Sequence, residues 1–455
     1  MTARPPAAEA VPEPLTTSQK SQALHSLLQQ LYESQYWTPK QLALGQLQQL
    51  KKLVAYAILY SPFYKKQFSG VDVNQLDMQA FAKLPLLTRL DLQAENEGID
   101  CVQVPQLHGA INQTMTSGST ATPVSLRGTA LTTTIWNALN MREELWHRRD
   151  YSQITASIRW NADPIGLAPE GIKTNDWDFP VNQFYKTAAS YYLNSSSDIS
   201  AQLQWLQKIQ PAYLMTHPSN LRAMLDESRR LGLPISGLKQ VRTVGENVSD
   251  DLREAVHSEL GAKLVDFYSS QEVGYLALQC PETGHYHVQS ESVLLEVLRE
   301  DGSVCDVGES GKIVVTSLRN YATPLIRYEI GDYGELGPPC SCGRSLPVLQ
   351  RINGRTRNML HLPSGSKSWP NFGFRKIMQV AELHQFQVIQ HGLESIELKV
   401  VLDEKLKPEQ EQKIKQFLCE HLGHPFAVNL TYHSDLPRSA NGKFEDFISM
   451  LEPGT

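Results

Sequence analysis

The sequence lacks any apolar run approaching the roughly 18–20 residues that cross a bilayer. Its N-terminus lacks a basic start followed by an apolar core, so it predicts no secretory signal. Clustered positive charge is also absent, and the formal net charge is −6 over 455 residues, which argues against nucleic acid or an anionic membrane as a partner. These absences favour a cytoplasmic protein without nucleic-acid or membrane partners.

Cysteine is scarce, and six cysteines in a chain of this length do not form a disulfide framework. Cys101, Cys305 and Cys419 are isolated in the sequence, which predicts small buried apolar side chains. Residues 1–17, rich in proline and alanine, predict a disordered tail. The length itself indicates two or three folding units.

Apolar spacing predicts the order of the elements. Two amphipathic helices open the ordered part, and Ser61-Pro62 ends the second. Helical pattern then covers 206–233 and 250–260, and each stretch is followed by a strand-like run, at 240–244 and 263–268. This alternation predicts an α/β fold with a largely parallel sheet.

From residue 292 the pattern changes to β structure. Apolar runs at 293–298 and 312–316 flank an Asp-Gly turn, which predicts a hairpin in a β subdomain at about 290–350. The last part of the chain has a strand pattern at 395–402 and a helix pattern at 408–422. These elements predict a small α+β C-terminal domain.

A run of hydroxyl side chains surrounds a glycine at 114–123. Backbone N–H and side-chain O–H donors in such a run can bind a polyphosphate, and glycine allows the backbone to approach it. The Gly-Lys-Ser/Thr ending of the common P-loop is absent. Taken alone, the run is equally well explained as a Ser/Thr-rich surface turn.

Three further motifs carry isolated charged residues. Glu272 follows a strand, where a carboxylate is well placed for Mg²⁺ on nucleotide phosphates. Asp332 has the two oxygens that a ribose diol can donate to. Lys443 follows an Asn-Gly turn and can enter a site as a mobile point charge. Each has a plain alternative: a solvent-facing loop glutamate, a β-turn aspartate and an exposed hairpin lysine.

The four motifs in this order resemble the adenylate-forming superfamily of acyl- and aryl-CoA synthetases, over most of the chain. Residues 60–64 and 84–92 look like the N-terminal signature of its phenylacetate–CoA ligase-like branch. The resemblance implies a large N-terminal α/β adenylation domain at 18–353 that includes the β subdomain, a hinge at 354–358, and a small mobile C-terminal domain at 359–455.

The resemblance also implies roles for individual residues. Glu272 would hold Mg²⁺, and Lys443 would be the catalytic lysine that contacts the α-phosphate and the acyl carboxylate. The implied ATP-binding residues are Thr116, Ser117, Gly118, Ser119, Thr120, Gly245, Glu246, Tyr268, Ser269, Asp332 and Arg355.

The implied activity is ATP-dependent conversion of a carboxylic acid to an acyl adenylate with pyrophosphate release, followed by transfer to a thiol, with CoA as the favoured acceptor. A carrier-protein thiol, an amine or another nucleophile remains an alternative acceptor. A catalytically silent binding homologue is an alternative of a different class. The oligomeric state stays open, with a homodimer as one option.

The sequence departs from the family pattern at several positions. Ala121 and Val124 stand where the family usually has glycine and lysine, and Gln271 replaces the usual threonine or serine. Arg357 and Asn358 replace acidic residues of the hinge. These departures bear on the rate and on the rotation of the C-terminal domain.

Three cysteines and a histidine form a second chemical group. Cys280, Cys340 and Cys342 with one imidazole are an ordinary tetrahedral zinc set, and His287 is favoured over His285 as the fourth ligand. Four protein ligands leave no open position, so the predicted zinc is structural. Reduced cysteines without a metal are the alternative.

The acyl pocket is the least marked part of the sequence. Trp160, Tyr185, Tyr191, His217 and Pro218 lie in the region that would line it and suggest an aromatic or medium-sized acid. Residues of these types are more often part of the core.

Overall fold

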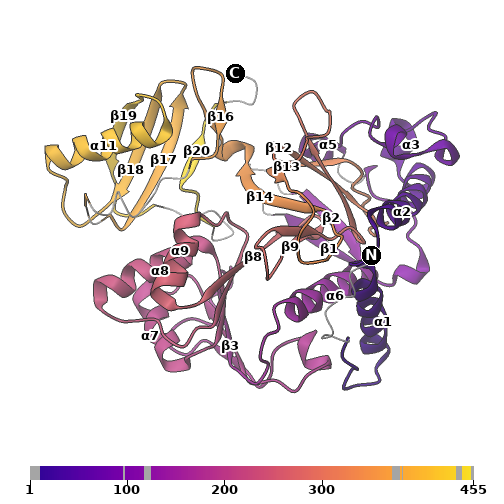
Figure 1. Cartoon of the computed structure of the whole chain (residues 1–455), viewed down its shortest axis with the longest axis horizontal. Coiled ribbons are helices and arrows are strands. Elements are labelled where there is room, and N and C mark those ends of the chain that lie inside the picture. The colour runs from indigo at the N-terminus through magenta and orange to yellow at the C-terminus, as the bar shows by residue number, and fades with distance from the viewer. Residues whose placement is uncertain are drawn as a thin grey trace. The chain divides into compact units, whose positions relative to one another are not determined.

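The computed structural model describes residues 11–95, 98–116, 124–370, 380–381, 383–436 and 443–451. The chain forms two compact units (Figure 1), and each is described by itself. Unit 1 takes in Met1–Gln153, Thr174–Ser190 and Val265–Ile352. Unit 2 takes in Ile154–Lys173, Tyr191–Leu264 and Asn353–Thr455. The last segment of unit 2 thus begins one residue before the predicted hinge. Much of the predicted tail, residues 1–10, lies outside the described residues.

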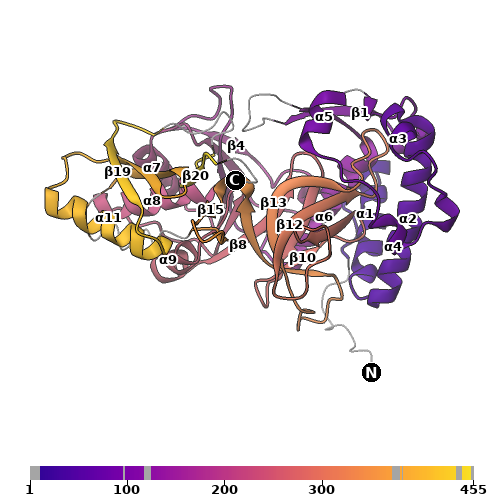
Figure 2. The same cartoon turned by 90° about the horizontal axis from the view of Figure 1, so that it is seen from above.

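Helices form the N-terminal part of unit 1. The two predicted amphipathic helices are α1 and α2, and their apolar stripes, including Leu28 and Leu53, are buried. Thr38 starts α2 with a capping box, and Ser61 ends it before Pro62. Figure 2 shows α1, α2 and α6 close to one another, and α1 packs against α6. The helices are α1 Gln19–Ser34, α2 Pro39–Tyr60, α3 Pro62–Gln67, α4 Met78–Phe81, α5 Arg89–Glu95 and α6 Ala130–Trp146, with 3-10 turns η1 Val73–Gln75, η3 Gln106–His108 and η4 Val181–Gln183.

The strands of unit 1 run in the order β11-β12-β13-β14-β10-β9-β8. The predicted hairpin is confirmed, because β11 and β12 pair antiparallel across a turn in which Gly302 has φ of +83°. A separate antiparallel pair is formed by β1 and β2. The strands are β1 Ile111–Thr116, β2 Val124–Thr129, β8 Lys263–Ser270, β9 Gly274–Gln279, β10 Tyr286–Val288, β11 Val293–Leu298, β12 Ser310–Ser317, β13 Tyr328–Leu336 and β14 Val348–Arg355.

The first part of unit 2 is an α/β layer with strand order β7-β6-β3-β5-β4. β3, β6 and β7 are parallel, as the sequence predicts. α7, α8 and α9 lie beside this layer (Figure 1). Their apolar residues pack with those of β3, β6 and β7 in one core. The elements are β3 Thr155–Arg159, β4 Ile172–Thr174, β5 Ser190–Asn194, α7 Ile199–Ile209, β6 Tyr213–Thr216, α8 Pro218–Leu231, β7 Gln240–Val244 and α9 Asp250–Leu260.

The predicted helix at 206–233 is wrong. The structure has the end of α7, the strand β6 and the helix α8 in its place. Gln210 leaves the helix with φ of +49°, and Pro211 cannot continue it. Taken alone, the apolar run of β6 is compatible with a helix. Its pairing with β3 on one side and β7 on the other makes it a buried strand.

The C-terminal part of unit 2 has a sheet of order β19-β18-β17-β20. The predicted helix at 408–422 is confirmed as α11, and the predicted strand is β18. α11 lies beside this sheet (Figure 1). Its Ile414 and Leu418 are buried with apolar residues of the sheet. The elements are η5 Thr356–Asn358, β15 Leu360–His361, β16 Lys367–Ser368, β17 Gln385–Gly392, β18 Ser395–Val401, α11 Pro408–Leu422, β19 Ala427–Tyr432 and β20 Phe447–Ser449. Among the described helices, none is both long and apolar enough to cross a membrane.

Candidate active site

Unit 1 joins two of the predicted nucleotide-binding residues. Tyr268, near the end of β8, donates a hydrogen bond from Oη to Oδ2 of Asp332 on β13, at 2.7 Å. These residues are 64 positions apart, and the ring of Tyr268 is buried. Asp332 is therefore held in one orientation by a neutral donor, and its carboxylate keeps acceptor capacity for a diol.

Glu272 lies in the turn between β8 and β9. Its Oε1 is 3.5 Å from Nη1 of Arg89, the first residue of α5. Sequence analysis missed Arg89, although it lies within the recognised stretch 84–92. One carboxylate beside a cavity fits Mg²⁺, which uses one or two protein carboxylates together with substrate phosphates and water. Arg89 is then a cation that competes with the metal for Glu272.

A cavity of about 190 Å³ opens at the Glu272 turn. One wall is aromatic, because Trp136 of α6 stacks on Tyr275 with ring centres 4.2 Å apart. Sequence analysis missed both residues, since an isolated aromatic in a helix or strand is usually a core residue. The remaining lining side chains are mostly polar and include Asn112, Thr132, Thr133, Gln271 and Arg319.

The predicted phosphate loop is largely outside the described residues, which exclude Ser117, Gly118, Ser119, Thr120 and Ala121. The hairpin that flanks it is described, and Thr116 at the end of β1 pairs with Val124 at the start of β2. Val124 is 3% exposed and belongs to the core of unit 1. The position at which the family has a charged lysine is thus an apolar core position in this chain.

Unit 2 brings Lys443 to Gly245. A Cβ placed on Gly245 would lie 3.1 Å from Cε and 3.3 Å from Nζ of Lys443. Gly245 has φ of +81°, so both its conformation and the close approach of the lysine favour glycine. The backbone N–H of Phe444 donates to Oε1 of Glu246 at 3.0 Å. The predicted catalytic lysine therefore lies against the turn that follows β7.

Glu246 also accepts hydrogen bonds at the start of α8. Its carboxylate accepts from the backbone N–H and the hydroxyl of Ser219, at 2.8 and 3.0 Å, in the first turn of α8. His217 precedes that helix, and its Nδ1 lies 2.8 Å from the carbonyl oxygen of Val244. The structure thus brings His217, Gly245, Glu246 and Lys443 together in unit 2.

The predicted acyl-pocket residues are divided between the two units. Trp160 is 37% exposed after β3, and Pro218 is buried at the start of α8. Tyr185 belongs to unit 1 and packs on Tyr151, with ring centres 4.1 Å apart. Tyr191 of unit 2 packs edge-on against Trp205. Tyr185 and Tyr191 thus have the aromatic core contacts that the plain alternative predicts.

The altered hinge residues contact the C-terminal part of unit 2. Arg357 pairs with Glu445, and the Asn358 amide donates to the carbonyl oxygen of Phe447 at 2.6 Å. The carbonyl oxygen of Arg355 accepts a hydrogen bond from the Trp369 indole at 3.3 Å. Basic and amide side chains at 357 and 358 therefore serve as donors in this chain, which acidic residues could not do.

The four predicted metal ligands meet in unit 1. The ligand atoms of Cys280, His287, Cys340 and Cys342 all lie within 4.8 Å of one another. The sulfurs of Cys280 and Cys340 are 3.8 Å apart, and thiolates bound tetrahedrally at about 2.3 Å would lie about 3.8 Å apart. The hydrogen bond with Cys342 lowers the pKa of the Cys280 thiol. This donor set fits zinc, and His285 is not part of the group.

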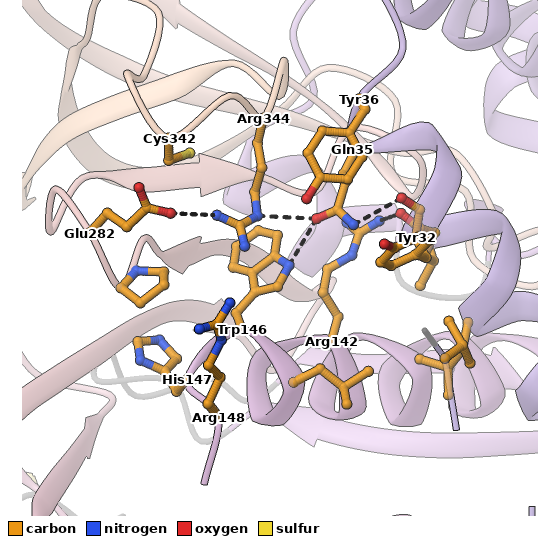
Figure 3. A pocket seen from close by; sticks show the side chains of 15 residues that line it. Tyr32, Gln35, Tyr36, Arg142, Trp146, His147, Arg148, Glu282, Cys342 and Arg344 are labelled. Carbon is orange, nitrogen blue, oxygen red and sulfur yellow. Dashed lines mark hydrogen bonds and ion pairs between the residues drawn. The ribbon is translucent and has the colours of Figure 1, made fainter. Parts of the chain in front are cut away.

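A larger cavity, of about 410 Å³, lies beside this group (Figure 3). Its arginines are engaged: Arg142 pairs with Glu291, and Arg344 lies over the Trp146 ring and donates to Gln35 at 3.1 Å. None of its described lining residues belongs to the four nucleotide and lysine motifs. The smaller cavity includes Glu272 of these motifs and is the candidate reactant chamber for that reason.

Comparison with solved structures defines the class of fold. The chain superposes on 2-hydroxyisobutyryl-CoA ligase, in the postadenylation state with 2-HIB-AMP, with a TM-score of 0.70, 18% identity, and coverage of 91% of this chain and 92% of that one. The anthranilate CoA ligase AuaEII with anthranoyl-AMP gives a TM-score of 0.54 at 15% identity, over 73% and 64% of the two chains. The fold is that of the adenylate-forming ligases.

Within that class, the sequence is similar to phenylacetate–coenzyme A ligases. It is 26% identical to the enzyme of Escherichia coli over 397 residues, covering 83% of this chain and 86% of the relative. It is 25% identical to that of Thermus thermophilus over 447 residues, covering 89% and 96%. Residues 371–449 match the model of the CapK C-terminal domain. The resemblance to the phenylacetate–CoA ligase-like branch is confirmed.

Proposed function

We propose that this chain activates a carboxylic acid with ATP, forming an acyl adenylate and pyrophosphate, and then transfers the acyl group to CoA. The observation that carries the proposal is the contact of Lys443 with Gly245, near 200 residues earlier, in a chain with the fold of adenylate-forming ligases. A lysine at this turn, brought there from the C-terminal part of the chain, could offset negative charge on a phosphate.

The charges of the reactants indicate a role for each of the proposed site residues. A carboxylate and a triphosphate repel each other, so cations must offset the charge that concentrates on the α-phosphate in the transition state. Glu272 would hold Mg²⁺, whose chemistry is to neutralise phosphate oxygens. Lys443 would contact the α-phosphate and the acyl carboxylate as a point charge. Asp332 would accept from the ribose diol, and Tyr268 would keep that carboxylate in place.

The proposal includes a structural zinc ion held by Cys280, His287, Cys340 and Cys342. Support comes from the convergence of three sulfurs and one imidazole on one point in unit 1. Cys280 follows β9 directly, and β9 begins just after the Glu272 turn. A bound zinc would thus stiffen the hairpin that carries Glu272.

The test is release of pyrophosphate from ATP over a panel of carboxylic acids, followed by addition of CoA and detection of the thioester by mass. Release that depends on an acid supports adenylation, and a thioester supports CoA as the acceptor. Adenylation without a thioester would favour a carrier-protein thiol or an amine as the acceptor. ATP binding without release for any acid would favour a catalytically silent binding protein.

Removing the hydrogen bond to Asp332 is expected to weaken nucleotide binding moderately. In Tyr268→Phe the Asp332 carboxylate loses this hydrogen-bond donor. We expect KM for ATP to rise about 5- to 10-fold, because a hydrogen bond of this kind contributes about 1–1.5 kcal/mol. Tyr333→Phe is the matched control, because Tyr333 makes an equally short hydrogen bond to Glu300, at 2.7 Å. Equal changes in KM for the two variants would contradict the role of Tyr268.

A further inference from the structure

A single arginine dominates the charge of the cavity at Glu272. Arg319 follows β12 and lines that cavity. Its Nε donates to the carbonyl oxygen of Glu291 at 3.3 Å, and in the described part of the chain it has no ion pair. Burial lowers the pKa of Arg319 below its ordinary value, although it stays charged at neutral pH.

The other charged groups at the cavity are matched. Arg127 pairs with Asp100 at 3.3 Å, and Glu272 is 3.5 Å from Arg89. The charge of Glu291 also acts on Arg319, but its carboxylate is engaged by both terminal nitrogens of Arg142, at 3.1 and 2.7 Å. The cavity therefore has one net positive charge, on Arg319. A partly buried cation without a carboxylate partner costs folding free energy, which an anionic ligand would offset.

The cavity is small and has two kinds of wall. Its volume is about 190 Å³, against about 410 Å³ for the cavity beside the cysteine group. Trp136 and Tyr275 give it a flat apolar wall, whereas Thr132, Thr133 and Asn112 make it polar elsewhere. These dimensions suit a compact acid, and the polar lining suits a substituted one.

We propose that the acid this chain activates carries a second anionic group, which Arg319 binds, while the proposed Mg²⁺ at Glu272 and Lys443 offset the charge of the reacting carboxylate and the phosphates. This inference rests on the proposed function and specifies its substrate class: a compact dicarboxylic acid or another acid with a second negative charge. Arg319 is the specificity-determining residue. A simple aryl acetate or alkanoate would leave its charge unmatched.

The experiment is ATP–pyrophosphate exchange, which reports acid activation alone because it needs no acyl acceptor. Butanedioate is compared with its monomethyl ester and with pentanoate, and benzenedicarboxylates with benzoate. A charge-assisted hydrogen bond predicts a kcat/KM for the dianion about 10- to 100-fold above that of its monoanionic partner. The monomethyl ester separates charge from size.

Arg319→Gln keeps a donor for the Glu291 carbonyl and loses the charge. We expect it to raise KM for the dianions and reduce the preference to about onefold, with less than about a threefold change for the monoanions. Arg319→Lys, which keeps the charge, is expected to keep part of the preference. In Arg127→Gln, where the lost cation was already paired, the preference is expected to persist.

The outcomes separate this inference from the proposed function. Exchange with monoanions at least as fast as with dianions would overturn the inference and leave the function standing. An equal loss with both acid classes in Arg319→Gln would also overturn it, since Arg319 would then be structural or bind ATP. No exchange with any acid would overturn the proposed function, and this inference with it.

Discussion

Replacing Lys443 by alanine is expected to slow acid-dependent pyrophosphate release by about 10²–10³-fold, which is the size of effect that loss of one transition-state charge contact produces. The reason is the geometry of unit 2, where the ammonium of Lys443 lies at the Gly245 turn. Ground-state affinity for ATP is expected to change little, because the proposed ribose contacts are made by Asp332 and Tyr268. Release is measured under saturating ATP and acid.

The matched control is Lys415→Ala in the same part of the chain. Lys415 is on α11, 37% exposed, and lies 3.8 Å from Glu411, an exposed pair of small energetic value. We expect its rate to remain within about twofold of the parent. A Lys443→Ala protein that releases pyrophosphate at the parental rate would contradict the assigned role.

Substitution of one metal ligand is expected to have the largest effect on stability. In Cys340→Ser the zinc content is expected to fall from about one equivalent to well below it, since three ligands bind structural zinc weakly. The loops at 280–287 and 340–342 would lose their cross-link. The free energy of unfolding of unit 1 would fall by about 3 kcal/mol or more. A melting temperature lower by roughly 6–12 °C, with new proteolytic cleavage in these loops, is the expected readout.

Cys419→Ser is the control, because Cys419 is partly buried in the C-terminal part of unit 2 and is not in the metal-ligand group. It is expected to keep the metal and to melt within a few degrees of the parent. Purified parent protein with far less than one equivalent of zinc would defeat the zinc proposal. The four residues would then be a reduced thiol group packed around His287.

The fold could be predicted well where the local apolar spacing agrees with the face that each element buries in the tertiary structure. β7, α9 and α11 have the predicted bounds, because alternating or 3.6-residue apolar spacing matches the face that each element buries. The helix predicted at 206–233 failed because β6 is only four residues long. A run that short has no periodicity of its own, and its neighbours β3 and β7 decide its conformation.

The candidate site likewise contains residues that could be predicted from the sequence and residues that could not. Glu272, Asp332 and Lys443 stand in short motifs whose order along the chain made them recognisable, and no contact had to be known. Arg89, Trp136, Tyr275 and Arg319 escaped prediction because each stands alone in the sequence. Arg319 matters only because Arg127 and Glu291 have partners of their own, and a sequence does not record which charges are matched.

The sequence by itself predicted most helices and strands and the group of three cysteines and one histidine, and its resemblance to a known family predicted the class of chemistry and the residues proposed to carry it. Local apolar spacing suffices for the helices and strands, since it is a property of a few neighbouring residues. Tertiary structure alone decided which parts meet: Tyr268 with Asp332, Lys443 with Gly245, and an unmatched Arg319 with Glu272 at one cavity. Such meetings depend on how distant segments pack, and that is fixed by the whole core of each unit.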